Sequence, residues 1–177
     1  MAVQIGARPD SGFDDPIGML KDCHRRIEHF LNTICLVVER ARARRLSEEE
    51  ASAIEAALLY FRVGGRRHSA DEEESLFPRM RQDAALAGMP ELLKLENEHR
   101  EANRLHEVVS LLCLAWIRNG RLNAENEQQL ASAMQRLKGL YVEHIEIEET
   151  VVFPRAAAAL DGKTIAVIGE EFRGRRA

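Results

Sequence analysis

The feature that most constrains this chain is a twelve-residue segment that occurs twice, at residues 68–79 and 144–155. The copies lie 76 residues apart (144 − 68), and six of their twelve positions are identical: His68, Glu72, Glu73, Phe77, Pro78 and Arg79 correspond to His144, Glu148, Glu149, Phe153, Pro154 and Arg155. Because an α-helix has about 3.6 residues per turn, the histidine and the first glutamate of each copy share one helix face. Each copy therefore predicts one imidazole and one carboxylate aimed at a common point.

Two further histidines stand at matching distances upstream of the two copies. His24 precedes His68 by 44 residues (68 − 24), and His99 precedes His144 by 45 (144 − 99). The chain thus reads as a nearly duplicated pair of helices, in which each half supplies a histidine and then His-x-x-x-Glu. Antiparallel packing of the two halves would place four imidazoles and two carboxylates at one level.

Apolar periodicity predicts four long helices that end near residues 44, 80, 118 and 159. Their expected starts are Asp14-Asp15-Pro16, a capping box at Ser47 to Glu50, Glu91 after the Gly88-Met89-Pro90 break, and a cap at Asn123. Gly64-Gly65 and Pro78 interrupt the second helix and predict a kink or a loosened turn near His68. Asn119-Gly120 is expected to end the third.

These elements predict an all-α fold, an up-down-up-down four-helix bundle with a short C-terminal extension. No stretch has a convincing strand pattern of period two, and 177 residues suffice for one well-buried core. The predicted divisions are an N-terminal tail over 1–13, the bundle over 14–160 and a C-terminal tail over 161–177. We expect that last tail to be a short helical turn followed by a basic, frayed end.

Composition excludes several classes of function. A net charge of −4 and dispersed arginines argue against a nucleic-acid partner. No segment approaches the roughly 20 apolar residues of a membrane span, and the first residues lack an apolar leader, so we expect a cytoplasmic protein. The three cysteines have no metal-like spacing and are interpreted as small buried hydrophobes: Cys23, Cys35 and Cys113. Motifs for nucleophilic catalysis are absent.

The predicted cluster has four neutral nitrogens and two anionic oxygens, a set that suits iron, manganese or zinc. Six ligands from four helices do not easily serve one ion, whereas two ions bridged by Glu72 and Glu148 would use them all. Two carboxylates only partly offset the charge of two such ions. The cluster therefore predicts a binuclear centre with room for an oxide, hydroxide or water bridge.

With these residues the chain resembles the hemerythrin-like, HHE cation-binding family. The resemblance covers roughly residues 14–159 and rests on the duplicated His-x-x-x-Glu-Glu followed by Phe-Pro. It implies a four-helix bundle around a non-haem di-iron centre. Carried over by position, it implies that two histidines bind each iron and two glutamates bridge them: His24 and His68, His99 and His144, and Glu72 with Glu148.

Two departures from the oxygen-carrying hemerythrins refine this expectation. Those proteins resemble the pattern but have a second histidine one turn after the third-helix ligand, where this chain has Asn103, and an aspartate five residues after the fourth-helix histidine, where it uses Glu148 at four. The four-His, two-Glu set is more similar to di-iron proteins that repair iron centres under nitric oxide or oxidative stress. Those usually carry an extra cysteine-bearing N-terminal segment, which we do not expect in this protein.

The resemblance therefore implies a protein that binds or reacts with O2, NO or peroxide, in sensing, scavenging or iron-centre repair. The alternative is a non-catalytic module that stores or buffers iron or holds structural zinc. The sequence leaves open whether the site is catalytic, and it names no protein partner.

Several polar residues near the cluster have competing interpretations. Glu28 either supports His24 or serves as an extra ligand, or else it forms a surface ion pair with Arg25 or a neighbour. His106 either lines an access path or is an ordinary exposed or hydrogen-bonded histidine. Tyr141 either donates to a metal-bound species or is a core tyrosine with one satisfied polar end. Two glutamates adjacent to the expected bridges and one further histidine are interpreted as surface groups: Glu73, Glu149 and His29.

Overall fold

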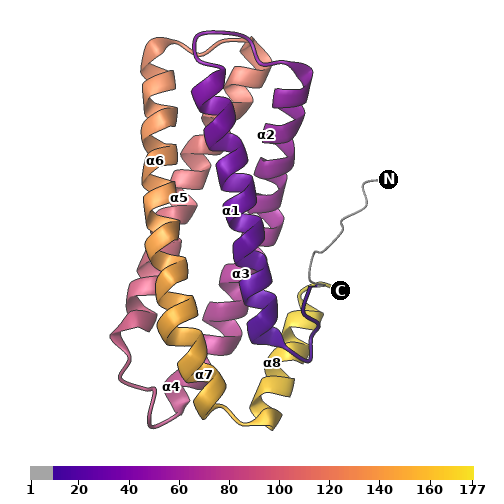
Figure 1. Ribbon diagram of the computed structural model, residues 1–177, viewed down its shortest axis with the longest axis vertical. Helices are drawn as coiled ribbons and strands as arrows, with labels where there is room; N and C mark the ends of the chain where they lie inside the picture. Colours follow the sequence, from indigo (N-terminus) through magenta and orange to yellow (C-terminus); the bar gives the residue numbers. More distant parts are fainter. Residues whose placement is uncertain (1–9) are drawn as a thin grey trace.

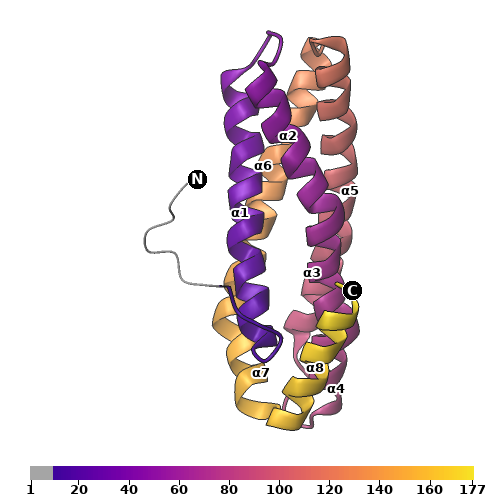
Figure 2. The ribbon, with the colours of Figure 1, turned by 90° about the vertical axis from the view of Figure 1, so that its right-hand side faces the viewer.

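The computed structural model describes residues 10–177, and within that range it contains helices and no strands. Four long helical rods run alternately up and down (Figures 1 and 2). The first rod is α1 (Pro16–Arg40). The second consists of α2 (Glu48–Tyr60), α3 (Arg66–Asp71) and α4 (Phe77–Gln82), which follow one another without a break. The third is α5 (Pro90–Asn119), and the fourth consists of α6 (Ala124–Ile147) and α7 (Phe153–Ala159). A shorter helix, α8 (Gly162–Gly174), packs at the lower end of the bundle. The predicted all-α bundle is confirmed; the predicted tail over 1–13 lies mainly outside the described residues.

The helix starts follow the predicted caps. The Asp15 carboxylate accepts the Gly18 amide at 2.9 Å, and Asn123 accepts the Asn126 amide at 2.8 Å. Ser47 and Glu50 form the reciprocal capping box. The first helix is expected from the sequence to end near residue 44, but α1 ends four residues earlier, at Arg40. Ala43 adopts a left-handed φ of 58°, so the helix does not continue through it to residue 44.

Both repeated segments contain a π-helical turn at the same place. The turns span Glu72–Leu76 and Glu148–Val152, so each begins at a repeated glutamate and ends before a repeated Phe-Pro. Proline lacks an amide hydrogen and cannot continue the regular hydrogen-bond ladder, which favours a widened turn just upstream. A third π turn, at Phe61–Gly65, contains the predicted Gly64-Gly65 interruption. The predicted loosened turn near His68 is therefore present as π-helix.

Two buried apolar clusters fill the bundle, one above and one below the level of the repeated histidines. The upper cluster includes Ile27, Phe61, Ala102 and Leu137, and the lower one includes Leu20, Leu76, Leu95 and Val152. His24, His68, His99 and His144 each fall in sequence between a residue of the lower cluster and one of the upper cluster. The polar layer that they form therefore has hydrophobic core at both ends, which shields it from water.

The expectation of a frayed C-terminal tail is wrong. Asp161 caps α8 by accepting the Thr164 amide at 2.8 Å, and the helix buries Ile168 and Phe172 in the lower cluster. Gly169 is required at the contact, because a Cβ atom there would lie 1.9 Å from the Phe13 carbonyl oxygen. Apolar burial and ion pairs to the second rod, described below, hold this end of the chain in place.

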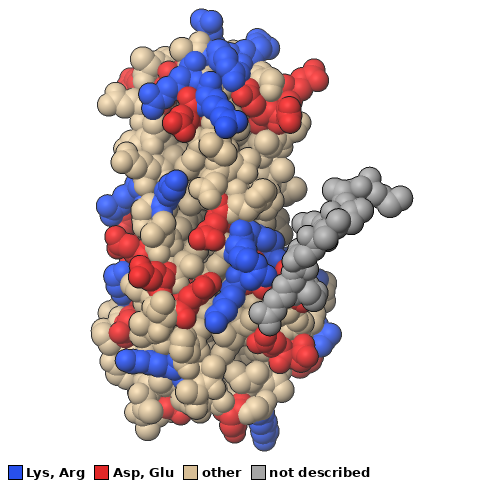
Figure 3. Space-filling model, viewed as in Figure 1, with Lys and Arg blue, Asp and Glu red and all other residues tan. Residues whose placement is uncertain are grey.

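The surface in Figure 3 carries charges of both signs. Lys and Arg side chains gather at the upper end, where α1 joins α2, and acidic side chains lie beside them. None of the helices in residues 10–177 is both long enough and apolar enough to cross a bilayer.

Candidate metal centre

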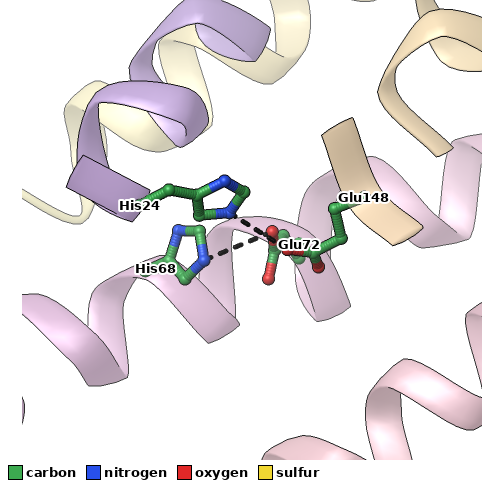
Figure 4. A group of neighbouring side chains, drawn as sticks. All are labelled: His24, His68, Glu72 and Glu148. Atoms are coloured by element: carbon green, nitrogen blue, oxygen red, sulfur yellow. Dashed lines mark ion pairs between the residues drawn. The ribbon is translucent and has the colours of Figure 1, made fainter. Parts of the chain in front are cut away.

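The structure brings all six predicted ligand residues into one buried layer. Each of the four rods contributes one histidine, and each of the two π turns contributes its first glutamate. Every one of the six has at most 5% of its surface exposed. Figure 4 shows the imidazoles of His24 and His68 facing the carboxylates of Glu72 and Glu148.

The layer divides into two groups that share both carboxylates. One group is His24, His68, Glu72 and Glu148; the other is Glu72, His99, His144 and Glu148, and the potential ligand atoms of each group lie within 4.8 Å of one another. Glu148 lies 3.0 Å from Nε2 of His24 and 3.1 Å from Nε2 of His144. Glu72 lies 3.4 Å from Nε2 of His68 and 3.3 Å from Nε2 of His99. Each carboxylate thus spans the two groups, which is the arrangement that two bridging ligands would have.

An outer ring of carboxylates accepts hydrogen bonds from three of the imidazoles. Nδ1 of His24 donates to Glu149 at 2.8 Å, and Nδ1 of His99 donates to Glu73 at 2.7 Å. Nδ1 of His144 donates to Glu98 at 3.0 Å. These bonds fix the ring orientation and leave Nε2 free to face the centre. The interpretation of Glu73 and Glu149 as surface groups is therefore incomplete, and the sequence pattern gives no indication of the contact of Glu98 with His144.

The repeated phenylalanines lie against the imidazoles from below. The ring of Phe153 stacks on His24 with centroids 5.5 Å apart, and Phe77 lies parallel to His99 at 6.5 Å. Both phenylalanines are fully buried. Each copy of the segment thus supplies a carboxylate shared by both groups, an outer carboxylate and a buried aromatic ring. The outer carboxylate and the ring contact a histidine of the other half of the bundle.

Charge in the layer is unevenly distributed. Burial disfavours the ionised form of Glu72, and its proximity to Glu148 raises the pKa of Glu72 further above its ordinary value. Burial acts against ionisation of Glu148 too, but His144 and His24 outweigh it and hold the pKa of Glu148 well below the usual range. Two facing carboxylates at the middle of a bundle are costly without cations. The layer is therefore electrostatically suited to bind positive ions.

The hydrogen-bonding state of the layer tests whether a metal fits. Nine buried side-chain nitrogen or oxygen atoms in residues 10–177 lack a hydrogen-bond partner. Seven of them face the centre of the layer: both carboxylate oxygens of Glu72 and of Glu148, and the Nε2 atoms of His24, His99 and His144. Buried polar atoms in native proteins are nearly always satisfied, so such a concentration calls for a partner. Nitrogen and carboxylate donors in this number suit transition metal ions.

The structure also gives the positions and contacts of the residues with competing interpretations. Glu28 and His29 are exposed and lie outside both groups, and Arg25 pairs with Asp22 rather than with Glu28. The Tyr141 hydroxyl and Nε2 of His106 are hydrogen-bonded at 2.9 Å. Tyr141 is thus a tyrosine with a satisfied polar end, as one interpretation held. Two of the cysteines are buried and the third is half-buried, and all three are free: Cys23, Cys113 and Cys35.

His106 lies between this layer and a surface groove. A groove of about 520 Å³ runs between α2 and α5, and Phe61, Asn103 and His106 are among its lining residues. The His106 ring packs on Phe61 with centroids 4.2 Å apart. Tyr141, the hydrogen-bond partner of His106, lies between His106 and the layer, and its ring centroid is 6.4 Å from that of His144. His106 is therefore both a groove-lining residue and a hydrogen-bonded histidine, and its role on an access path stays a prediction.

Burial lowers the pKa of His106 to about 4, from an ordinary value of 6.5. As pH falls through this window the unfolded chain takes up a proton and the folded chain does not, so His106 makes folding stability fall on acidification. The free energy of unfolding should therefore fall less between pH 7 and pH 4 when His106 is replaced by Phe, by up to about 3 kcal/mol. Urea unfolding of the metal-free protein at both pH values measures it; an NMR titration in which the His106 ring protonates near 6.5 contradicts it.

Buried histidine and carboxylate ligands at the middle of four antiparallel helices define a metal-binding helical bundle. Residues 15–156 match the model of the hemerythrin HHE cation binding domain, and the chain belongs to that family. The chain is also similar to the iron-sulfur cluster repair protein YtfE of Enterobacter sp. (strain 638), with 26% identity over 136 residues. That match covers 70% of this chain and 57% of the relative, so the chain spans little more than half of the relative's length.

Proposed function

We propose that this protein binds two iron ions in the buried layer and uses them to bind or react with O2, NO or peroxide. The observation that carries the proposal is the pair of four-residue groups that share Glu72 and Glu148. Four imidazoles and two carboxylates are too many ligands for one ion at these positions and suit two. The name of the relative, an iron-sulfur cluster repair protein, supports iron-centre repair as the setting for this chemistry.

In this proposal His24 and His68 would hold one iron, His99 and His144 would hold the other, and the two shared glutamates would be ligands of both. A pair of iron ions supplies one-electron redox chemistry and vacant coordination positions for a small ligand. The apolar clusters above and below exclude water from the layer, and the outer carboxylates keep three imidazoles in a fixed orientation. The protein's own contribution is thus a dry, rigid and negatively charged site.

The groove between α2 and α5 is the proposed route for the ligand. Its wall is mainly apolar, with Leu58, Leu59, Leu111 and Leu114 among the lining residues, and His106 and Phe61 lie on the side toward the layer. Its charged residues carry both signs in equal number, Glu55 and Glu107 against Arg62 and Arg66, so they favour neither anions nor cations, and the apolar area suits a small uncharged molecule. The cytoplasmic location and the small diatomic or peroxide partner expected from the sequence belong to the same proposal.

The test is anaerobic loading with Fe²⁺, metal quantification, and an optical spectrum recorded as oxygen is admitted and then withdrawn. We expect two iron ions per chain and a visible absorption band that forms with oxygen. A band that disappears on withdrawal indicates reversible binding, and a lasting ferric spectrum indicates redox turnover. Binding of a single ion, or two ions that leave the spectrum unchanged with oxygen, NO and peroxide, contradicts the proposal and favours a storage or structural module.

A further inference from the structure

The duplication in the sequence extends to the contacts around the layer. Glu149 of the second π turn supports His24 of α1, and Glu73 of the first π turn supports His99 of α5. These two contacts are equivalent under the internal repeat, since His99 follows His24 by 75 residues (99 − 24) and Glu149 follows Glu73 by 76 (149 − 73). The bundle therefore has an approximate two-fold symmetry that relates the two groups of ligands.

One contact breaks this symmetry. Glu98 accepts the Nδ1 hydrogen of His144 at 3.0 Å and is itself held by Lys94, whose Nζ lies 2.7 Å from the other Glu98 oxygen. The residue that corresponds to Glu98 in the first half is Cys23 (98 − 75). Cysteine has no carboxylate, and the thiol of Cys23 accepts a hydrogen bond from Arg26 at 3.3 Å. Residue 23 therefore supplies no equivalent support.

His68 is the imidazole affected. It is the repeat equivalent of His144, it is 3% exposed, and its Nδ1 atom has no hydrogen-bond partner within residues 10–177. A carboxylate that accepts the Nδ1 hydrogen makes the opposite nitrogen a stronger metal ligand and locks the ring; losing such a partner typically weakens metal affinity 10- to 100-fold. Three of the four histidines have that support and His68 does not.

We infer that the two metal positions are unequal, that the ion at His24 and His68 is the labile one, and that Cys23 opposite Glu98 is the origin of the difference. The inference rests on the proposed binuclear site. Its ligands alone would give two nearly equivalent positions, because each position has two histidines and the same two glutamates. The outer carboxylates, two around one position and one around the other, distinguish them.

The experiment follows loss of metal, independent of any reaction with oxygen. The full chain is loaded anaerobically with Fe²⁺, desalted, and mixed with excess of a chelator that absorbs visible light when it binds Fe²⁺. We expect two equal phases, each of one ion per chain, with rates that differ by about 10- to 100-fold. Fewer than two ions at the start contradicts the proposed function; two ions that leave at one rate contradict only this inference.

Two isosteric substitutions assign the phases. Glu98→Gln removes the carboxylate from His144 and is expected to accelerate the slow phase 10- to 100-fold, so that the phases merge. Glu149→Gln removes support from His24 and is expected to accelerate only the fast phase. Glu101→Gln, three residues after Glu98 on the same helix and paired with the exposed Arg136, is the matched control and should leave both rates unchanged. If Glu98→Gln accelerates the fast phase alone, the labile ion is at the other position and the inference is wrong.

Discussion

Replacement of Glu148 by alanine is expected to reduce the metal content of the protein from two ions per chain to one or none. Glu148 belongs to both four-residue groups and lies within 3.1 Å of two imidazole nitrogens, on His24 and His144. Its removal takes one ligand from each position at once. It also halves the negative charge shared by the two positions, leaving Glu72 as the only carboxylate between two cations that repel each other.

The measurement is elemental analysis after loading with Fe²⁺ and desalting, with helical content checked by circular dichroism. Glu146→Ala is the matched control, because Glu146 is an exposed glutamate two residues away on the same rod. The control should retain both ions. Full retention by Glu148→Ala, with the fold intact, would show that the shared carboxylate does not bind metal and that the ligand assignment is wrong.

The ligand layer could be predicted from the sequence because its information is local and repeated. His68 and Glu72, like His144 and Glu148, are one helical turn apart, so a helix alone places them together. The matching spacing to His24 and His99 then fixes the register of the other two helices. Helix caps at Asp15, Ser47 and Asn123 are local in the same way, and they also agree with the structure.

The outer carboxylates could not be predicted in this way, because each one acts between rods. Glu149 reaches His24 across 125 residues of sequence, and Glu73 reaches His99 across 26. On a regular helix, adjacent residues point about 100° apart, which directs Glu73 and Glu149 away from the centre. The π turns that begin at Glu72 and Glu148 alter this local geometry. In the sequence, the two Phe-Pro dipeptides are the signal that points to these turns.

The C-terminal helix shows the same limitation in a different form. Its short apolar pattern and basic end are typical of a frayed terminus, yet Arg175 and Arg176 both reach Asp71, more than 100 residues away in sequence. Arg79 of α4 also pairs with Glu171 at 2.6 Å. Asp71 immediately precedes Glu72, which belongs to both four-residue groups, so the end of the chain is held beside the buried polar layer.

Removal of both arginines, in the double variant Arg175→Ala/Arg176→Ala, is expected to lower the free energy of unfolding by about 3 kcal/mol at pH 7. Asp71 is fully buried, and these two guanidinium groups are its cationic partners at 3.0 and 2.5 Å. Without them a buried carboxylate has no counter-charge. Arg173→Ala is the matched control on the same helix: Arg173 is exposed, pairs with the exposed Glu170 and lies over the Phe13 ring, so its loss should cost no more than about 1 kcal/mol.

Two further measurements separate loss of charge pairing from loss of packing. Burial already raises the pKa of Asp71 above 3.8 despite both arginines, and their removal should raise it further. A buried carboxyl group destabilises the folded protein less when it is protonated. The destabilisation of the double variant should therefore shrink as pH falls through the raised pKa of Asp71 in the folded protein. Adding Asp71→Ala to the double variant should recover part of the lost stability, because no buried charge then remains. A deficit that is independent of pH and unchanged by Asp71→Ala would instead mean that the arginines act through the contacts of their guanidinium groups with the Phe172 ring.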